Sequence, residues 1–243
     1  MPVQDMKRAM TQAALLITRP HASALHFKAQ LSQDVQRNVK IVISPLLEIV
    51  STGVQPDITN YAGAIFTSAN AVSLVPEGAE KPAYCVGSAT AERAKVAGWR
   101  VSAQELNADD LVAQIAGMKP QGPLLHPAGR HRRGEIAARL TALGIKTDVQ
   151  VLYDQKPLPL SEQARALFKR EGQILIPLFS PRSATQFVEQ APHLRGVTVV
   201  CISDAVAQRC QGSGVASVIT VPAPTSLEML RSVEKVLRST SLA

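Results

Sequence analysis

The stretch ILIPLFSPRS, residues 174–183, decides the fold class. Its first six residues are apolar and have the length of a buried strand, and the serine and proline that follow are residues that begin helices. A strand that leads directly into a helix is typical of α/β proteins with parallel sheets. A similar stretch, IFTSA, occurs at residues 65–69, so that Ser68 stands 112 residues before Ser180. The sequence therefore predicts that this strand–helix unit is repeated.

Further segments correspond in the same order and extend the repeat along the chain. Residues 124–127 and the predicted helix 135–143 match residues 15–19 and 22–31. The later pairs are residues 146–156 with 40–50, 199–210 with 84–94, and 221–227 with 106–111. A duplication of this size predicts two domains rather than a solenoid.

Two extended segments, residues 39–51 and 146–157, occupy the same place in the two halves. Each is too long for a strand of a small sheet, so we expect them to connect two lobes. The first strand–helix unit of each half then joins the later units of the other half. Each lobe therefore contains parts of both halves. The sequence predicts two α/β lobes with parallel sheets, residues 13–38 with 158–243 and residues 52–145, and a chain that crosses between them twice.

The charge of the chain favours an anionic partner, because its 243 residues carry a formal net charge of +7. The basic residues are spread thinly apart from residues 130–133, and only 4% of the residues are aromatic, which leaves few platforms for stacking bases. No zinc finger or RNA-binding motif occurs. We expect a small polyanionic ligand and no nucleic acid. The alternative, a nucleic-acid binder, predicts binding that weakens steeply with salt.

The compartment follows from the cysteines and the apolar pattern. No apolar run approaches the ~20 residues of a membrane span, and the polar residues 1–12 lack the pattern of a secretory signal. Cys85, Cys201 and Cys210 do not have the spacing of a zinc site or a disulfide framework, and the histidines lack the spacing of metal ligands. We expect a cytoplasmic protein that binds neither metal nor membrane.

Hydroxyl side chains and arginines follow the predicted strands, which is where ligands of open α/β sheets bind. Serine and threonine also cap helices, so capping alone accounts for many of them. Their recurrence at equivalent places favours an anion held by hydroxyls, backbone amides and helix N-termini, with arginines that suit carboxylates. The candidate binding residues are Thr18, Arg19, Thr67, Ser68, Ser88, Thr90, Arg130, Ser180, Arg182 and Thr225.

Tyr153 is the candidate catalytic residue and lies in the second extended segment. One interpretation is a tyrosine that packs at an interface with its hydroxyl at the surface. The other is a phenol that donates a hydrogen bond or a proton to a leaving oxygen, since a phenol with a pKa of about 10 is protonated at neutral pH.

Six motifs in order over about residues 15–235 resemble the uroporphyrinogen-III synthase family. The motifs are LITRP at residues 16–20, IFTSANAV at 65–72, VGSATA at 86–91, VLY at 151–153, FSP at 179–181 and PT at 224–225. The resemblance implies two flavodoxin-like lobes joined by a two-stranded connector. It also implies the cyclisation of hydroxymethylbilane to uroporphyrinogen III, with inversion of ring D through a spiro intermediate, loss of water and no cofactor.

The resemblance assigns roles to particular residues. The proposed acid tyrosine of the family corresponds to Tyr153, and its ligand-lining hydroxyls correspond to Thr67, Ser68, Thr90, Ser180 and Thr225. Arg19, Arg130 and Arg182 are candidates on charge and position only. The alternative function is a non-catalytic two-lobed binding protein for a small polyanion, which has no need of Tyr153. We expect a monomer, because the duplication already supplies two related lobes.

Overall fold

The chain forms two compact units in a computed structural model that describes residues 13–132, 134–170 and 172–241. Among the described residues, unit 1 combines residues 13–48 with those from 157 to 241, and unit 2 is the segment 49–156 between them. Residues 1–12, for which the sequence predicts no secretory signal, lie outside the described part. No helix in the described part is long and apolar enough to cross a membrane.

Unit 1 contains a parallel five-stranded sheet in the order β11-β10-β9-β1-β2. Read from the edge at β2, this is the flavodoxin order 2-1-3-4-5. The three central strands are fully buried, as expected for strands covered on both faces. The strands are β1 (Ala14–Ile17), β2 (Lys40–Ile43), β9 (Ile174–Leu178), β10 (Val197–Cys201) and β11 (Ser217–Thr220).

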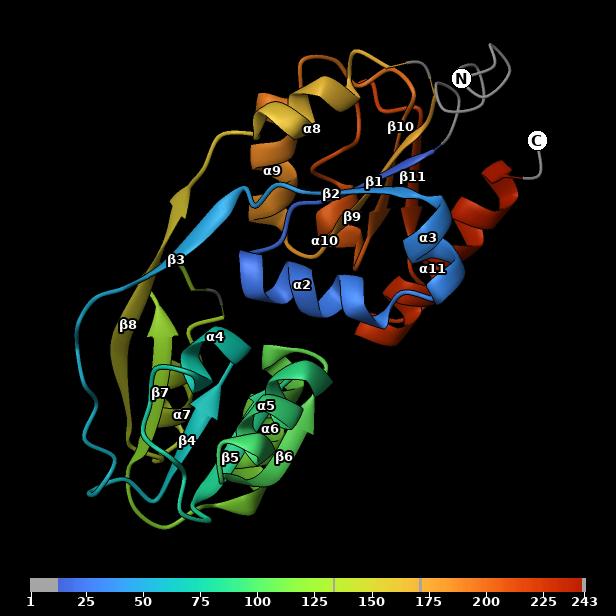
Figure 1. Ribbon diagram of the computed structural model, residues 1–243. Helices are drawn as coiled ribbons and strands as arrows, with labels where there is room; N and C mark the ends of the chain where they lie inside the picture. Colours follow the sequence, from blue (N-terminus) through green and yellow to red (C-terminus); the bar gives the residue numbers. More distant parts are fainter. Residues whose placement is uncertain (1–12, 133, 171, 242–243) are drawn as a thin grey trace. The chain divides into compact units, whose positions relative to one another are not determined.

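Helices cover both faces of the unit 1 sheet (Figure 1). One face packs Leu15, Ile17 and Leu175 against α2, α3 and α11. The other packs Leu16, Ile176 and Leu178 against α8, α9 and α10. The helices are α2 (His21–Gln30), α3 (Gln33–Asn38), α8 (Glu162–Leu167), α9 (Pro181–Gln190), α10 (Asp204–Ala207) and α11 (Ser226–Ser241).

Unit 2 contains a six-stranded sheet in the order β3-β8-β7-β4-β5-β6. From β8 onward the strands are parallel. They have the 2-1-3-4-5 arrangement when β7 and β8, which come last in the chain, are numbered 1 and 2, and β4, β5 and β6 are numbered 3, 4 and 5. The strands are β3 (Leu47–Ser51), β4 (Gly63–Phe66), β5 (Pro82–Val86), β6 (Arg100–Glu105), β7 (Leu124–Gly129) and β8 (Thr147–Pro157).

The unit 2 sheet is also covered on both faces (Figure 1). Phe66, Cys85 and Leu152 pack against α4 and α5, together with Trp99. Ile65, Tyr84 and Leu124 pack against α6 and α7. The helices are α4 (Ala69–Val72), α5 (Ser88–Val96), α6 (Ala108–Met118) and α7 (Ile136–Ala142).

The strand orders confirm the predicted fold class of two parallel α/β lobes with exchanged units. In unit 1, β1 and β2 come from the first half of the chain and pair with β9, which comes from the second half. In unit 2, β7 from the second half pairs with β4 from the first half. Each sheet is therefore completed by strands from both halves of the duplication.

The two extended segments differ from the predicted connectors of residues 39–51 and 146–157. Lys40–Ile43 is a strand of the unit 1 sheet, and residues 147–153 pair with β7. Only β3 and the end of β8 form the two-stranded ribbon: Thr52 N donates to Leu152 O (2.9 Å), and Leu158 N donates to Leu46 O (2.9 Å), so the two strands run in opposite directions. Each extended run therefore serves first in a sheet and then in the connection, so its length alone does not make the whole of it a connector.

Gly78 lies where a side chain would collide with the core of unit 2. A Cβ added at Gly78 would lie 2.5 Å from Trp99 Cδ2 and 2.7 Å from Trp99 Cα. The Trp99 ring cannot easily yield, because it packs edge-on against Phe66 with centroids 5.1 Å apart. We expect Gly78→Ala to lower the free energy of unfolding by about 1–3 kcal/mol, measured by urea denaturation.

The matched control is Gly117→Ala in α6, where an added Cβ has no neighbour within 4 Å. Alanine in a helix interior should raise the stability by roughly 0.5–1 kcal/mol. Equal effects of the two substitutions would contradict the tight packing of Gly78 on Trp99.

Candidate functional site

Each unit has one place where a ligand can approach the ends of adjacent strands. In a 2-1-3-4-5 sheet the chain leaves the strands numbered 1 and 3 in opposite directions, so a crevice opens beyond their carboxyl ends. These strands are β1 and β9 in unit 1 and β7 and β4 in unit 2. We call these two places the switch points of the units.

The switch point of unit 2 holds the phenol of Tyr153. Tyr153 lies on β8 opposite Gly129, the last residue of β7. A Cβ at Gly129 would lie 2.6 Å from Tyr153 Cε2 and 3.1 Å from its Oη, so the phenol occupies the space that glycine leaves open. The ring is 4% exposed and packs in the core that contains Phe66. Gly129 therefore allows Tyr153 to cross β7 and reach the end of β4.

The Tyr153 hydroxyl forms a hydrogen bond with Ser68, which follows β4. Burial raises the pKa of Tyr153 above its usual value, and the Ser68 hydrogen bond offsets part of this effect. Ser68 Oγ caps α4 by accepting a hydrogen bond from Asn70 N (3.2 Å). If the Ser68 hydroxyl donates its own hydrogen to Tyr153, the phenolic hydrogen is left for a ligand. The raised pKa keeps the phenol protonated at neutral pH, at the carboxyl ends of β7 and β4.

Arg130 follows Gly129 and is held by the residue after Tyr153. Its Nε donates to Asp154 Oδ2 (3.2 Å), and its backbone N donates to Tyr153 O (2.8 Å). His131 Nε2 lies 3.6 Å from Asp154 Oδ1. The backbone hydrogen bond from Gln155 is the main cause that lowers the pKa of Asp154, with a further contribution from Arg130. The Arg130 side chain is 63% exposed and accessible to an anion. Arg133, in the same basic cluster, lies outside the described residues.

The other predicted residues of unit 2 differ in accessibility. Thr67 lies directly between β4 and Ser68 and is partly exposed. Ser88 is exposed at the first position of α5, after Gly87, whose φ of 82° suits glycine. Thr90 is only 6% exposed inside α5. Ser88 is therefore better placed than Thr90 to contact a ligand.

The predicted residues of unit 1 include two helix caps. Ser180 Oγ accepts from Ser183 N (3.1 Å) at the start of α9, and Thr225 Oγ1 accepts from Glu228 N (3.2 Å) at the start of α11. Arg182 lies in the first turn of α9 and is partly exposed. Thr18 follows β1 but is 1% exposed. The capping interpretation is thus correct for Ser68, Ser180 and Thr225, and each cap aligns a helix N-terminus at a strand end.

Arg19 and Phe179 meet at the switch point of unit 1. The Arg19 guanidinium carbon lies 3.9 Å from the centroid of the Phe179 ring. Arg19 follows β1, and Phe179 follows β9. Burial lowers the pKa of Arg19 from 12.5 to about 10, so the group stays positively charged at neutral pH.

Comparison with known proteins gives the family of the chain. The family model described as uroporphyrinogen-III synthase HemD matches residues 29–231. The chain belongs to the uroporphyrinogen-III synthase family. The match spans every predicted site residue except Thr18 and Arg19, which precede it.

Solved structures of the same family show the same fold. A uroporphyrinogen-III synthetase from Helicobacter pylori superposes with a TM-score of 0.65 at 17% identity, covering 93% of this chain and 100% of the other. A mutant uroporphyrinogen III synthase from Thermus thermophilus gives a TM-score of 0.53 at 14% identity, covering 93% and 99%. No curated protein sequence matches significantly.

His126 is not among the residues predicted for the site, yet it is an unusual residue of β7. His126 is 2% exposed, and within the described part of the chain neither ring nitrogen has a hydrogen-bond partner. Burial lowers its pKa from 6.5 to about 4, and Arg132 adds to the effect. The only sequence signal was a histidine inside an apolar strand, three residues before Gly129.

His126 makes the stability dependent on pH. Its pKa is lower in the folded than in the unfolded state, so the unfolded state binds the proton more readily as the pH falls from 6.5 toward 4. Protonation of His126 in the unfolded state should therefore lower the free energy of unfolding by about 2 kcal/mol between pH 7 and pH 5. We expect His126→Leu to remove this part of the pH dependence, measured by urea denaturation at both pH values. An unchanged difference in the variant would contradict the assignment.

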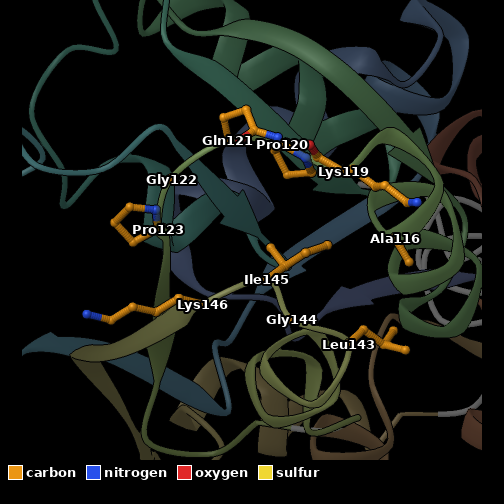
Figure 2. Close-up of a pocket in the computed structure, with 10 residues that line it drawn as sticks. All are labelled: Ala116, Lys119, Pro120, Gln121, Gly122, Pro123, Leu143, Gly144, Ile145 and Lys146. Carbon is orange, nitrogen blue, oxygen red and sulfur yellow. Dashed lines mark hydrogen bonds between the residues drawn. The ribbon is translucent and has the colours of Figure 1, made fainter.

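A pocket in unit 2 lies at the edge opposite the switch point (Figure 2). It has a volume of about 430 Å³ and lies where β7 and β8 begin, beside the ends of α6 and α7. Lys119 and Lys146 are among its lining residues. The candidate binding residues follow the other ends of the strands, so this pocket lies apart from the candidate site.

Proposed function

We propose that the protein converts hydroxymethylbilane to uroporphyrinogen III. The observation that carries the proposal is the Tyr153 phenol, held between Gly129 and Ser68 at the switch point of unit 2. A non-catalytic binding protein has no need of a buried proton donor at this place. Membership of the family supports the same reaction.

The first step needs an acid. The hydroxymethyl group leaves as water when Tyr153 gives its proton to the departing oxygen while the C–O bond breaks, which forms a cationic azafulvene and a phenolate. The hydrogen-bond donor Ser68 stabilises the phenolate. Ring D then attacks the azafulvene carbon through its substituted α-carbon and forms a spiro intermediate. The bond from that α-carbon to the neighbouring bridge breaks, and the bridge carbon reattaches at the free α-carbon of the inverted ring.

The last step returns the enzyme to its starting state. Rearomatisation of the final ring releases a proton, and the Tyr153 phenolate recovers one, so the net reaction is loss of one water. Unassisted closure gives the uninverted type I isomer, so the enzyme must hold the substrate in the geometry that favours the spiro carbon. Orientation of this kind supplies much of the catalytic effect.

The remaining groups of the site suit a substrate with eight carboxylates. The helix N-termini that Ser68, Ser180 and Thr225 cap carry partial positive charge and donate backbone N–H groups. Arg130 and Arg182 add full charges that can form paired hydrogen bonds to carboxylates. We propose that Thr67 and Ser88 contribute hydroxyls. Thr18 and Thr90 are buried, so Thr18 would act by shaping the segment after β1, and Thr90 by shaping the first turn of α5.

We also propose that the protein is a lyase that acts as a cytoplasmic monomer. The internal duplication supports the monomer, because two related units already come from one chain. The three cysteines support a reducing compartment, since all three are buried and free. A molar mass that rises with concentration in sedimentation experiments would contradict the monomer.

The test is an assay of isomers. Purified protein is given fresh hydroxymethylbilane, the products are oxidised, and the type III and type I porphyrins are separated. We expect type III in excess over a control without protein. Type I alone, formed at the uncatalysed rate by well-folded protein, would contradict the proposal and favour the polyanion-binding alternative.

A further inference from the structure

Arg19 extends across the switch point of unit 1. It follows β1, and its guanidinium lies over the ring of Phe179, which follows the neighbouring strand β9. The contact therefore joins the ends of the two strands between which an open α/β sheet binds its ligand. A guanidinium that lies over an aromatic face can still offer its N–H groups to a carboxylate.

The aromatic platform is itself fixed. Phe179 packs edge-on against Phe27 of α2, with ring centroids 5.3 Å apart and an interplanar angle of 80°. Phe27 is fully buried in the core of unit 1. A ring anchored in this way limits the rotamers that Arg19 can adopt, which lowers the entropy lost when the guanidinium binds an anion.

The charge of Arg19 has no acidic partner in the described part of the chain. None of the ion pairs there includes Arg19, and α2, which begins two residues later, has no acidic residue in its first turn. Arg130, by contrast, is paired with Asp154. Arg19 is partly exposed, so an incoming carboxylate can reach its guanidinium, whose charge has no acidic partner among the described residues, and form charge-assisted hydrogen bonds with it.

We infer that Phe179 is a positioning residue that holds the Arg19 guanidinium over its ring at the switch point of unit 1, where the guanidinium binds one carboxylate of the substrate in bidentate fashion. The inference rests on the proposed function for the identity of the carboxylate. The two residues have different roles. Arg19 contacts the substrate, and Phe179 acts only through Arg19.

The experiment compares Phe179→Leu with Phe179→Tyr. Leucine keeps an apolar side chain but removes the aromatic face, and tyrosine keeps the face. We expect Phe179→Leu to raise KM for hydroxymethylbilane about 3- to 10-fold, with kcat within about twofold of the wild type, since no reacting atom is touched. Phe179→Tyr should restore the KM of the wild type.

A double-variant cycle separates positioning from packing. Arg19→Ala alone should raise KM by roughly 10- to 100-fold, as expected for a charged hydrogen-bonded pair. Adding Phe179→Leu to Arg19→Ala should cause no further rise, because the ring then has nothing to position. The control for lost aromatic packing is Phe168→Leu, on the opposite face of the same sheet, which should lower stability and leave KM unchanged.

The outcomes also separate this inference from the proposed function. If the wild type forms no type III isomer, the proposed function fails, and binding of uroporphyrin III followed by fluorescence still reports whether Arg19 binds a polycarboxylate. If the wild type is active and Phe179→Leu has the KM of the wild type, the positioning role is wrong. Additive effects in the double variant would overturn it equally, since each residue would then act by its own route.

Discussion

Tyr153→Phe is expected to form the type III isomer about 10²- to 10⁴-fold more slowly than the wild type, which is the range for loss of a general acid. The substitution keeps the ring in the space above Gly129 and removes only the hydroxyl that hydrogen bonds to Ser68. The substrate hydroxyl must then leave without a proton from Tyr153, which slows the first step. The measurement is the single-turnover rate of type III formation, with the type I isomer rising to its uncatalysed share as the enzyme slows.

The matched control for this variant is Tyr61→Phe. Tyr61 lies in the same unit, and its hydroxyl donates to Asp148 Oδ2 (3.2 Å) far from the strand ends that carry Ser68. Both substitutions should lower the free energy of unfolding by about 1 kcal/mol, the value of one hydrogen bond. Only Tyr153→Phe should slow the reaction. A Tyr153→Phe variant with the rate of the wild type would exclude the phenol as the acid.

The second large effect is expected for Gly129→Ala. The added methyl group would lie 2.6 Å from Tyr153 Cε2 and 2.8 Å from its Cζ, closer than atoms in contact can approach. The ring must move, so the phenol leaves Ser68 and the end of β4. We expect a loss of rate similar to that of Tyr153→Phe, together with a loss of stability of about 1–3 kcal/mol. Isomer assays and urea denaturation measure the two effects.

A double variant tests whether Gly129 acts through Tyr153. In a Tyr153→Ala background the space above Gly129 is open, so Gly129→Ala should cost little further stability and no further rate. If Gly129→Ala destabilised the Tyr153→Ala protein as much as the wild type, the added methyl group would clash with atoms other than the Tyr153 ring. Gly129 would then not be required by Tyr153.

The sequence was sufficient for the fold class because the strand–helix units repeat. The apolar stretches at residues 65–69 and 174–183 became β4 and β9, which hold the same position in the two sheets. The short elements were missed. The strand β6 reads RVSAQE, with few apolar residues, and α3 and α8 have six residues each. Their stability comes from packing on the sheets, which local pattern does not reveal.

The candidate site was predictable in residue type and less so in role. Tyr153 was predicted as the candidate catalytic residue, but its contacts with Gly129 and Ser68 join three separate segments, which only the strand order brings together. Arg19 was predicted on charge and position, while its contact with Phe179 links residues 160 positions apart in the chain. Burial separates Ser88 from Thr90, although both lie in one motif. Residues that act through a distant neighbour leave no local signal.

The exchange of strands also fixes the order in which the nascent chain can fold. Unit 2 is one continuous segment, so the ribosome completes its sheet before it has made β9, the strand that joins the two parts of unit 1. The apolar strands β1 and β2 emerge first but must wait while about 130 further residues are made, a delay on the order of ten seconds at ordinary rates of synthesis. During that time a two-stranded fragment offers two unpaired apolar edges to the cell. The unit that begins the chain is therefore the last to form, and the stage of synthesis most prone to aggregation precedes β9.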